Sequence, residues 1–223
     1  MFADVASRLD ADVIAPDLPG HAGRDASRTN WGDAVAEVID IAGELSPDVV
    51  VGYSMGGRIA LNAALAAPQI ARELILISTS LGIADDMDRA RRLQTDAATA
   101  AGLQSGDDAV EYLKSFHDSP IVRAHRSTID LEALRFGMAP EGLVGALQGM
   151  GQGSQPFVGD RLAELPMNVT WMAGAEDAKY AAIAREASAR CRHGSLVVVA
   201  DSGHNVVAER PDAVAAAITA ALS

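Results

Sequence analysis

The stretch Asp48–Leu61, DVVVGYSMGGRIAL, joins a run of β-branched residues to an alanine-rich helical pattern through a glycine-flanked serine. Val49–Tyr53 is typical of a buried strand and Met55–Ala66 of a helix. Ser54 lies between them in a G-x-S-x-G pattern. A strand, a sharp turn and a helix around this pattern form a nucleophile elbow, which exposes the serine hydroxyl at the top of a sheet. The other interpretation is an ordinary serine in a glycine-rich turn.

The turn at the serine sets two further expectations. Gly52 and Gly56 are needed, because side chains on either side of the serine would collide in so sharp a bend. The following helix directs its N-terminus at whatever lies over Ser54, which favours negative charge there. The backbone N–H of Met55 is the expected oxyanion donor.

A nucleophilic serine of this kind needs an acid and a histidine that follow it in the chain, each just past a strand. VTWMAGAEDAKY is a strand whose following turn presents Glu176 and Asp177, and LVVVADSGHNVVAERP is a strand whose loop presents His204. We therefore predict Ser54, Asp177 and His204 as catalytic residues. Taken alone, Asp177 could instead be the N-cap of the next helix, and His204 could be a hydrogen-bonded loop histidine.

The remaining histidines do not suggest a second site. His117, His125 and His193 lie in polar contexts with no strand before them, which favours solvated or structural roles. His21 follows APDLPG, and a packing role in that loop is favoured for it. No two histidines have metal-ligand spacing beside a carboxylate, so we predict neither a metal nor a cofactor.

Composition limits the function classes. The 223 residues suffice for one well-buried domain. A formal charge of −12 argues against nucleic acid as a partner. The apolar runs are too short for a bilayer and the start has no signal-peptide pattern, so no membrane partner and a cytoplasmic location are predicted. Cys191 is the only cysteine, which excludes an internal disulfide.

The order of elements predicts an α/β fold with a doubly wound, mostly parallel sheet. Between Gly82 and Gln155 helical patterns occur without a convincing strand, which indicates a helical cap over residues 82–155 and a core of residues 1–81 and 156–223. Expected strands are Asp12–Ala15, Val49–Tyr53, Leu74–Ser78, Val169–Ala173 and Leu196–Ala200, and expected helices are Phe2–Leu9, Trp31–Leu45, Met55–Ala66, Ala178–Ala189 and Pro211–Leu222.

Five segments together resemble the MenH family of the α/β-hydrolase superfamily. They are VGYSMGGRIAL, ARRLQTD, GSQP, AGAEDAKY and DSGHNVVAERPDAV, and the resemblance runs from about Asp12 to the C-terminus. It implies the α/β-hydrolase fold and the synthesis of 2-succinyl-6-hydroxy-2,4-cyclohexadiene-1-carboxylate for menaquinone. In that reaction a cyclohexene substrate loses a proton and expels pyruvate. The resemblance makes Ser54 the base, His204 its partner and Asp177 the orienting acid.

The substrate implied by the resemblance is a small molecule with several carboxylates, which guanidinium groups suit well. Arg58 lies one helical turn after Ser54, and Arg92 and Arg135 lie in the cap segment. Their convergence would explain how an acidic chain binds an anion. The alternative for Arg92 and Arg135 is an exposed, solvated helix face. Two further residues, Tyr53 and Gln155, are weaker candidates for substrate contacts.

One departure from the family pattern keeps other functions open. The family has an earlier strand and a His-Gly motif that supplies a second oxyanion N–H, whereas this sequence begins inside the following helix. In the usual strand order that strand lies between Asp12–Ala15 and Val49–Tyr53, so we expect an N-terminally truncated core. We favour a true start of the protein upstream of Met1. The alternative is a short form that re-pairs its strands, or recruits one from another chain, and has lost or changed activity. The alternatives to the lyase are a carboxylesterase or thioesterase of the same fold and a non-catalytic relative.

Overall fold

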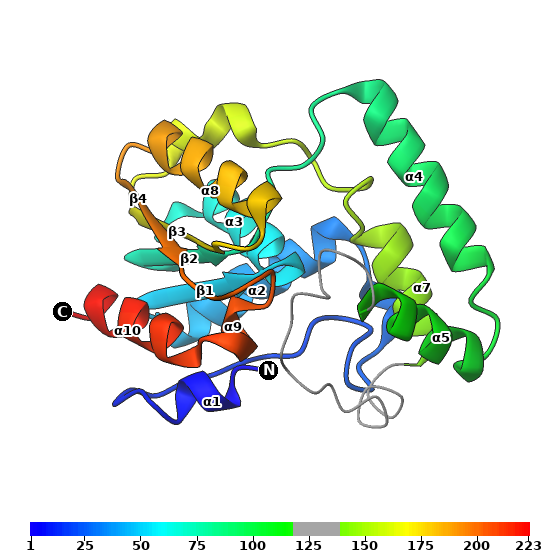
Figure 1. Cartoon of the computed structure of the whole chain (residues 1–223), viewed down its shortest axis with the longest axis horizontal. Coiled ribbons are helices and arrows are strands. Elements are labelled where there is room, and N and C mark those ends of the chain that lie inside the picture. Colours follow the sequence, from blue (N-terminus) through cyan, green and yellow to red (C-terminus); the bar gives the residue numbers. More distant parts are fainter. Residues whose placement is uncertain (118–138) are drawn as a thin grey trace.

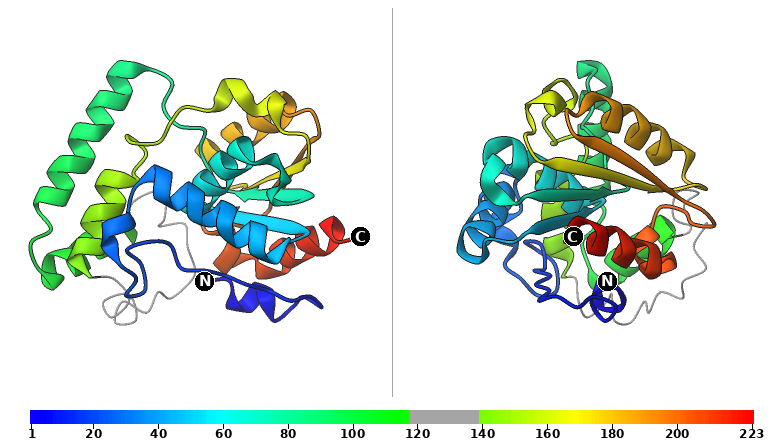
Figure 2. Two further views of the ribbon diagram at one scale, coloured as in Figure 1. Left: turned by 180° about the vertical axis from the view of Figure 1, so that it is seen from behind. Right: turned by 90° about the vertical axis from the view of Figure 1, so that its left-hand side faces the viewer.

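The computed structural model describes residues 1–117 and 139–223. A parallel sheet in the order β1-β2-β3-β4 forms its centre. Helices cover both faces of this sheet (Figures 1 and 2). The strands are β1 (Val49–Tyr53), β2 (Glu73–Ile77), β3 (Asn168–Gly174) and β4 (Gly194–Val199), and the predicted doubly wound α/β fold is confirmed.

The helices divide into those on the sheet and those beside it (Figure 1). The helices beside the sheet come between β2 and β3 in the chain. They are α4 (Asp86–Ala101), α5 (Gly106–His117) and α7 (Pro140–Gly149). The helices around the sheet are α1 (Ala3–Ala6), α2 (Trp31–Leu45), α3 (Met55–Ala66), α8 (Ala178–Arg190), α9 (Val206–Glu209) and α10 (Pro211–Ala221), and short 3-10 turns are η1 (Ala26–Arg28), η2 (Pro68–Ile70) and η3 (Gly159–Glu164). No helix among the described residues is long and apolar enough to cross a bilayer.

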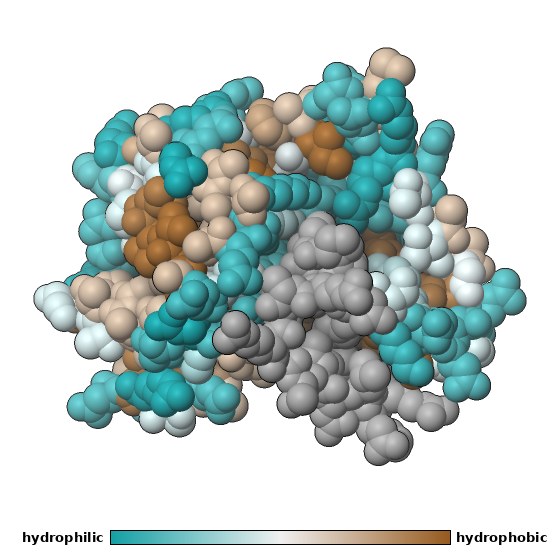
Figure 3. Space-filling model, viewed as in Figure 1, coloured by the Kyte–Doolittle hydropathy of each residue, from teal (hydrophilic) through white to brown (hydrophobic). Residues whose placement is uncertain are grey.

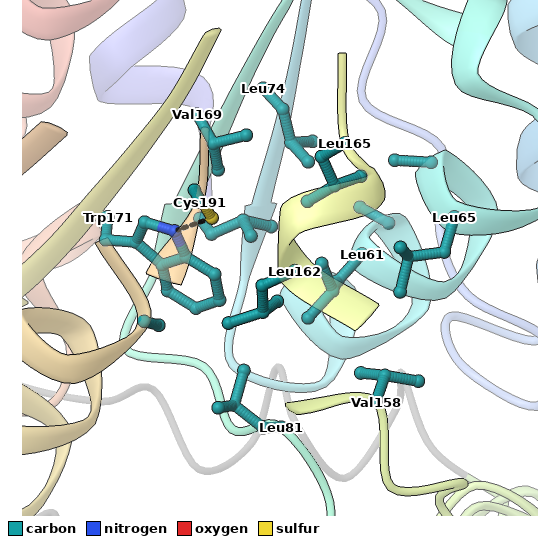
Figure 4. Packing of buried hydrophobic residues seen from close by; sticks show 14 of the residues in the cluster. Leu61, Leu65, Leu74, Leu81, Val158, Leu162, Leu165, Val169, Trp171 and Cys191 are labelled. Carbon is teal, nitrogen blue, oxygen red and sulfur yellow. Dashed lines mark hydrogen bonds between the residues drawn. The ribbon is translucent and has the colours of Figure 1, made fainter. Parts of the chain in front are cut away.

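The alternation of side chains along β2 divides the core into two clusters. Leu74 and Leu76 face a cluster built with α3 and α8, whereas Ile75 and Ile77 face one built with α9 and α10. This period of two is what a strand buried on both faces requires. In the first cluster the Trp171 indole donates to the Cys191 sulfur, and leucines from α3, β2 and η3 belong to the same cluster (Figure 4).

The predicted strand Asp12–Ala15 is wrong. The structure gives these residues no regular secondary structure and leaves the side chain of Ile14 62% exposed. An apolar run forms a strand only where a neighbour can pair with its N–H and C=O groups. Within the described chain the sheet ends at β1, which pairs on one side only, with β2. The predicted helix Phe2–Leu9 is likewise shorter, because α1 spans only Ala3–Ala6.

Candidate active site

The elbow at Ser54 is a bend that the backbone enters directly from β1. Ser54 has φ 48° and ψ −111°, a left-handed conformation that costs energy for a residue with a side chain. Its N–H still donates to the carbonyl of Ile77 in β2. Its carbonyl accepts from the Thr79 hydroxyl at 2.9 Å. Contacts on both sides of the residue therefore hold the strained conformation.

The prediction that the turn requires glycine on both sides of the serine is correct only in part. A side chain at Gly52 would come within 2.5 Å of the Gly57 backbone, so the close approach of strand and helix does require glycine there. At Gly56, however, an added Cβ would meet nothing within 4 Å. The second crowded position is Gly57, where a Cβ would lie 2.8 Å from the Thr79 side chain. The prediction was therefore right for Gly52 and wrong for Gly56.

Ser54, His204 and Asp177 form a hydrogen-bonded chain. The Ser54 hydroxyl lies 3.1 Å from His204 Nε2, and His204 Nδ1 lies 2.8 Å from Asp177 Oδ2. His204 and Asp177 are both buried. The second Asp177 oxygen accepts from the N–H of Tyr180, so this carboxylate also caps α8. The two interpretations of Asp177, acid and N-cap, thus describe one side chain that makes both contacts.

Surrounding residues fix the histidine. The ring of Tyr180 packs against His204 with centroids 4.5 Å apart, and the ring of Tyr53 lies at 5.6 Å. A hydrogen bond also holds the loop before His204, because the Gly203 N–H donates to the Glu209 carboxylate at 2.9 Å. Burial raises the pKa of Tyr53, with help from the charge of Glu209. The hydroxyl of Tyr53 therefore stays protonated at neutral pH.

Arg58 is a buried cation beside this chain. Its side chain is 8% exposed, it lies 5.4 Å over the Trp31 ring, and its buried Nη1 has no hydrogen-bond partner among the described residues. Burial lowers the pKa of Arg58 to about 10, Tyr180 opposes that shift, and the charge of Arg92 lowers the pKa further. Arg58 is thus charged at neutral pH and retains an unused donor.

Arg92 is held by the cap and by the loop after α7. Its Nε donates to Asp96 Oδ1 at 2.8 Å, and its Nη1 donates to Gln152 Oε1 at 2.9 Å. The amide nitrogen of Gln152 donates in turn to the Tyr180 hydroxyl at 2.8 Å. Arg92 is therefore more than a solvated cation on an exposed helix face. Asp96, Gln152 and Tyr180 were not predicted as site residues.

The other predicted site residues have different surroundings. Met55 is the first residue of α3, and N–H groups in the first turn of a helix lack a carbonyl partner within it. Gln155 is 1% exposed, and both ends of its amide are paired with Ser80. Arg135 and His125 lie outside the described residues. His21 bonds the carbonyl of Pro19. In the described part of the chain, no group of three His, Cys, Asp or Glu side chains could hold a metal.

Known proteins resemble this chain over most of its length. The sequence profile of the alpha/beta hydrolase family matches residues 1–217. The 2-succinyl-6-hydroxy-2,4-cyclohexadiene-1-carboxylate synthase of Serratia proteamaculans is 29% identical over 220 residues, which cover 91% of this chain and 80% of the relative. MenH from S. aureus superposes with a TM-score of 0.83 at 26% identity, over 92% of this chain and 81% of that one. An esterase from Exiguobacterium antarcticum, 15% identical with a TM-score of 0.72 over 93% and 80% of the two chains, shares the fold.

Proposed function

We propose that this chain, which belongs to the alpha/beta hydrolase family, is a lyase of menaquinone biosynthesis that resembles MenH. The proposed substrate is 2-succinyl-5-enolpyruvyl-6-hydroxy-3-cyclohexene-1-carboxylate, from which the enzyme eliminates pyruvate. The relatives named as the synthase support the reaction class. The observation that carries the proposal is the buried guanidinium of Arg58, one helical turn after Ser54, whose Nη1 has no partner within residues 1–117 and 139–223.

The chemistry begins with the serine. His204 Nε2 accepts the proton of the Ser54 hydroxyl, and the resulting oxygen removes a proton from a ring carbon of the substrate. Asp177 holds the imidazole in the required tautomer and stabilises its positive charge. The electron pair of the C–H bond forms a new ring double bond, the existing ring double bond shifts by one position, and the ring C–O bond breaks. Enolpyruvate leaves, takes up a proton and becomes pyruvate. The ring is now a conjugated diene.

The start of α3, next to Ser54, is suited to the negative charge that develops on the substrate. Negative charge builds up on the succinyl carbonyl oxygen, which is conjugated with the ring carbon that loses its proton. The Met55 N–H and the N-terminus of α3 stabilise that charge. Acyl transfer would use the same serine and the same donor, so the Ser–His–Asp chain alone does not separate a lyase from an esterase. The separation comes from the cations that bind the substrate.

Arg58 and Arg92 supply those cations in a chain of net charge −12. Their positive charges act on each other and on Tyr180, which packs on His204. A guanidinium donates two parallel hydrogen bonds to a carboxylate, which is the group an elimination substrate with several carboxylates offers. An esterase for neutral esters would gain nothing from a buried cation such as Arg58, whose desolvation is costly. Arg135 is the third proposed substrate cation.

The test is to give the purified chain the enolpyruvyl substrate and to follow pyruvate and diene absorbance together. We expect the two products in equal amounts. Neutral aryl esters and thioesters, incubated with the protein in parallel, should be turned over much more slowly. Ester hydrolysis without pyruvate release would support the esterase instead. A folded chain that is inert towards all of these substrates would support the non-catalytic relative.

A further inference from the structure

The amide of Gln152 connects the cap with the candidate active site. Gln152 lies in the loop that joins α7 to η3, with Arg92 of α4 on one side and Tyr180 of α8 on the other. A guanidinium carries only donors, so the Gln152 atom that faces Arg92 must be the amide oxygen. The amide nitrogen therefore faces Tyr180. The orientation of this amide follows from chemistry rather than from an arbitrary choice between oxygen and nitrogen.

The loop has little freedom to turn that amide around. The Gly153 N–H donates to Asp96 Oδ2, and the Ser154 hydroxyl accepts from the Trp31 indole. A Cβ at Gly153 would lie 2.7 Å from the backbone nitrogen of Leu93, so the loop is packed directly on α4. These contacts hold Gln152 between the cap and the core.

The direction of the hydrogen bond determines what Tyr180 can do. Because the Gln152 amide donates, the Tyr180 oxygen accepts, and the hydroxyl proton of Tyr180 remains to be donated elsewhere. In residues 1–117 and 139–223 this proton has no acceptor. Burial raises the pKa of Tyr180, although the charge of Arg58 opposes the shift, so the hydroxyl keeps its proton at neutral pH. A buried donor without an acceptor is costly unless a ligand satisfies it.

The surroundings of the hydroxyl favour one kind of acceptor. Tyr180 is 5% exposed, its ring lies against His204, and the positive charges of Arg58 and Arg92 both act on it. We propose that the Tyr180 hydroxyl donates to an anionic substrate oxygen held by Arg58 and Arg92, and that Gln152 is the positioning residue that directs it. This inference rests on the proposed function and adds to it a substrate-binding residue and the residue that orients it.

The first test is Tyr180→Phe, which removes the hydroxyl but leaves a ring against His204. A hydrogen bond to a charged group is worth roughly a tenfold change in binding, so we expect KM for the enolpyruvyl substrate to rise about tenfold with little change in kcat. Thr170→Val in β3 is the control, because it removes a hydroxyl that pairs only with exposed Ser195, and its KM should equal that of the parent. An unchanged KM in Tyr180→Phe, or an equal rise in Thr170→Val, overturns the proposal.

The second test concerns Gln152. In Gln152→Glu the carboxylate still accepts from Arg92 but also accepts the Tyr180 proton, which directs the hydroxyl away from the substrate. We expect KM to rise in the parent background and to rise much less when Tyr180→Phe is already present. Equal increases in the two backgrounds would mean that Glu acts only through its charge, and would contradict the positioning role.

Failure of the lyase reaction can be told apart from failure of this inference. If the parent chain releases no pyruvate, the proposed function is wrong. Calorimetric titration with the aromatic dicarboxylate phthalate then decides the role of Tyr180. Binding that is about tenfold weaker in Tyr180→Phe than in the parent supports an anion contact at this hydroxyl. Equal binding by the two proteins, or no binding by the parent, overturns it.

Discussion

The Ser54–His204–Asp177 chain and Arg58 beside it use hydrogen bonds in opposite ways. In the chain, both contacts that link the three side chains are made within the protein, at 3.1 and 2.8 Å. Beside it, Arg58 keeps a buried Nη1 unpaired in the described structure. Groups that react need a fixed geometry, whereas groups that bind need a donor free for the ligand. We therefore expect substitutions in the first region to change kcat and substitutions in the second to change KM.

The largest effect should come from Asp177, which serves both the histidine and α8. In Asp177→Asn the side chain can still cap the helix, but the charge that orients and stabilises His204 is lost. We expect kcat to fall by roughly 10²–10⁴-fold with little loss of stability. Steady-state kinetics and thermal unfolding measure the two quantities.

Asp177→Ala is the matched variant, because it removes the cap as well. It should be about as inactive as Asp177→Asn but less stable by about 1 kcal/mol. If Asp177→Asn kept the parent kcat, the orienting role of this carboxylate would be contradicted. If the two variants unfolded at the same temperature, the cap would contribute nothing.

A smaller effect, on binding rather than on rate, is expected at Arg58. Arg58→Met keeps an apolar chain over Trp31 and removes the charge. We expect KM to rise by roughly 10- to 100-fold while kcat changes little, because a hydrogen bond to a charged group is lost. The free energy of unfolding should stay constant or increase, since the folded protein no longer buries a guanidinium whose Nη1 lacks a partner in the described residues. A loss of stability without any change in KM would make Arg58 a structural cation instead.

The smallest effect is expected at Asp96, which is 4% exposed and contacts both Arg92 and the loop that carries Gln152. Asp96→Asn keeps the shape but weakens the hold on the Arg92 guanidinium. A rise in KM of about fivefold, equivalent to ~1 kcal/mol, is expected. Asp88→Asn, at an exposed pair on the same helix, is the control and should not change KM. A kcat defect in Asp96→Asn with an unchanged KM would contradict a role in substrate binding.

The sequence predicted best what depends on local pattern. Val49–Tyr53 and Met55–Ala66 begin and end where expected, because a β-branched run and an alanine-rich segment each favour one conformation. The approach of Asp177 and His204 was also predictable, since the carboxyl ends of parallel strands meet at one edge of a sheet. The strand at Asp12–Ala15 failed because pairing depends on a neighbour that a short apolar run does not reveal.

The contacts around Gln152 and Gly57 were harder to predict. The contact of Gln152 with Tyr180 joins residues 28 positions apart through the packing of a loop on α4, and no spacing rule encodes such a contact. Gly57 was missed as a crowded position because the crowding comes from Thr79, on the segment after the next strand. Tertiary contacts of this kind become visible only once the cap and the core are placed together.

The most direct test of the account is to add the enolpyruvyl substrate to Ser54→Ala and to measure binding and diene formation in the same sample. The account predicts binding as tight as in the parent, because the arginines are intact, and a rate of diene formation lower by roughly 10²–10⁴-fold, because the base is gone. Diene formation at the parent rate would contradict the assignment of Ser54 as the base. Loss of binding in a folded Ser54→Ala would contradict the separation of chemistry from binding.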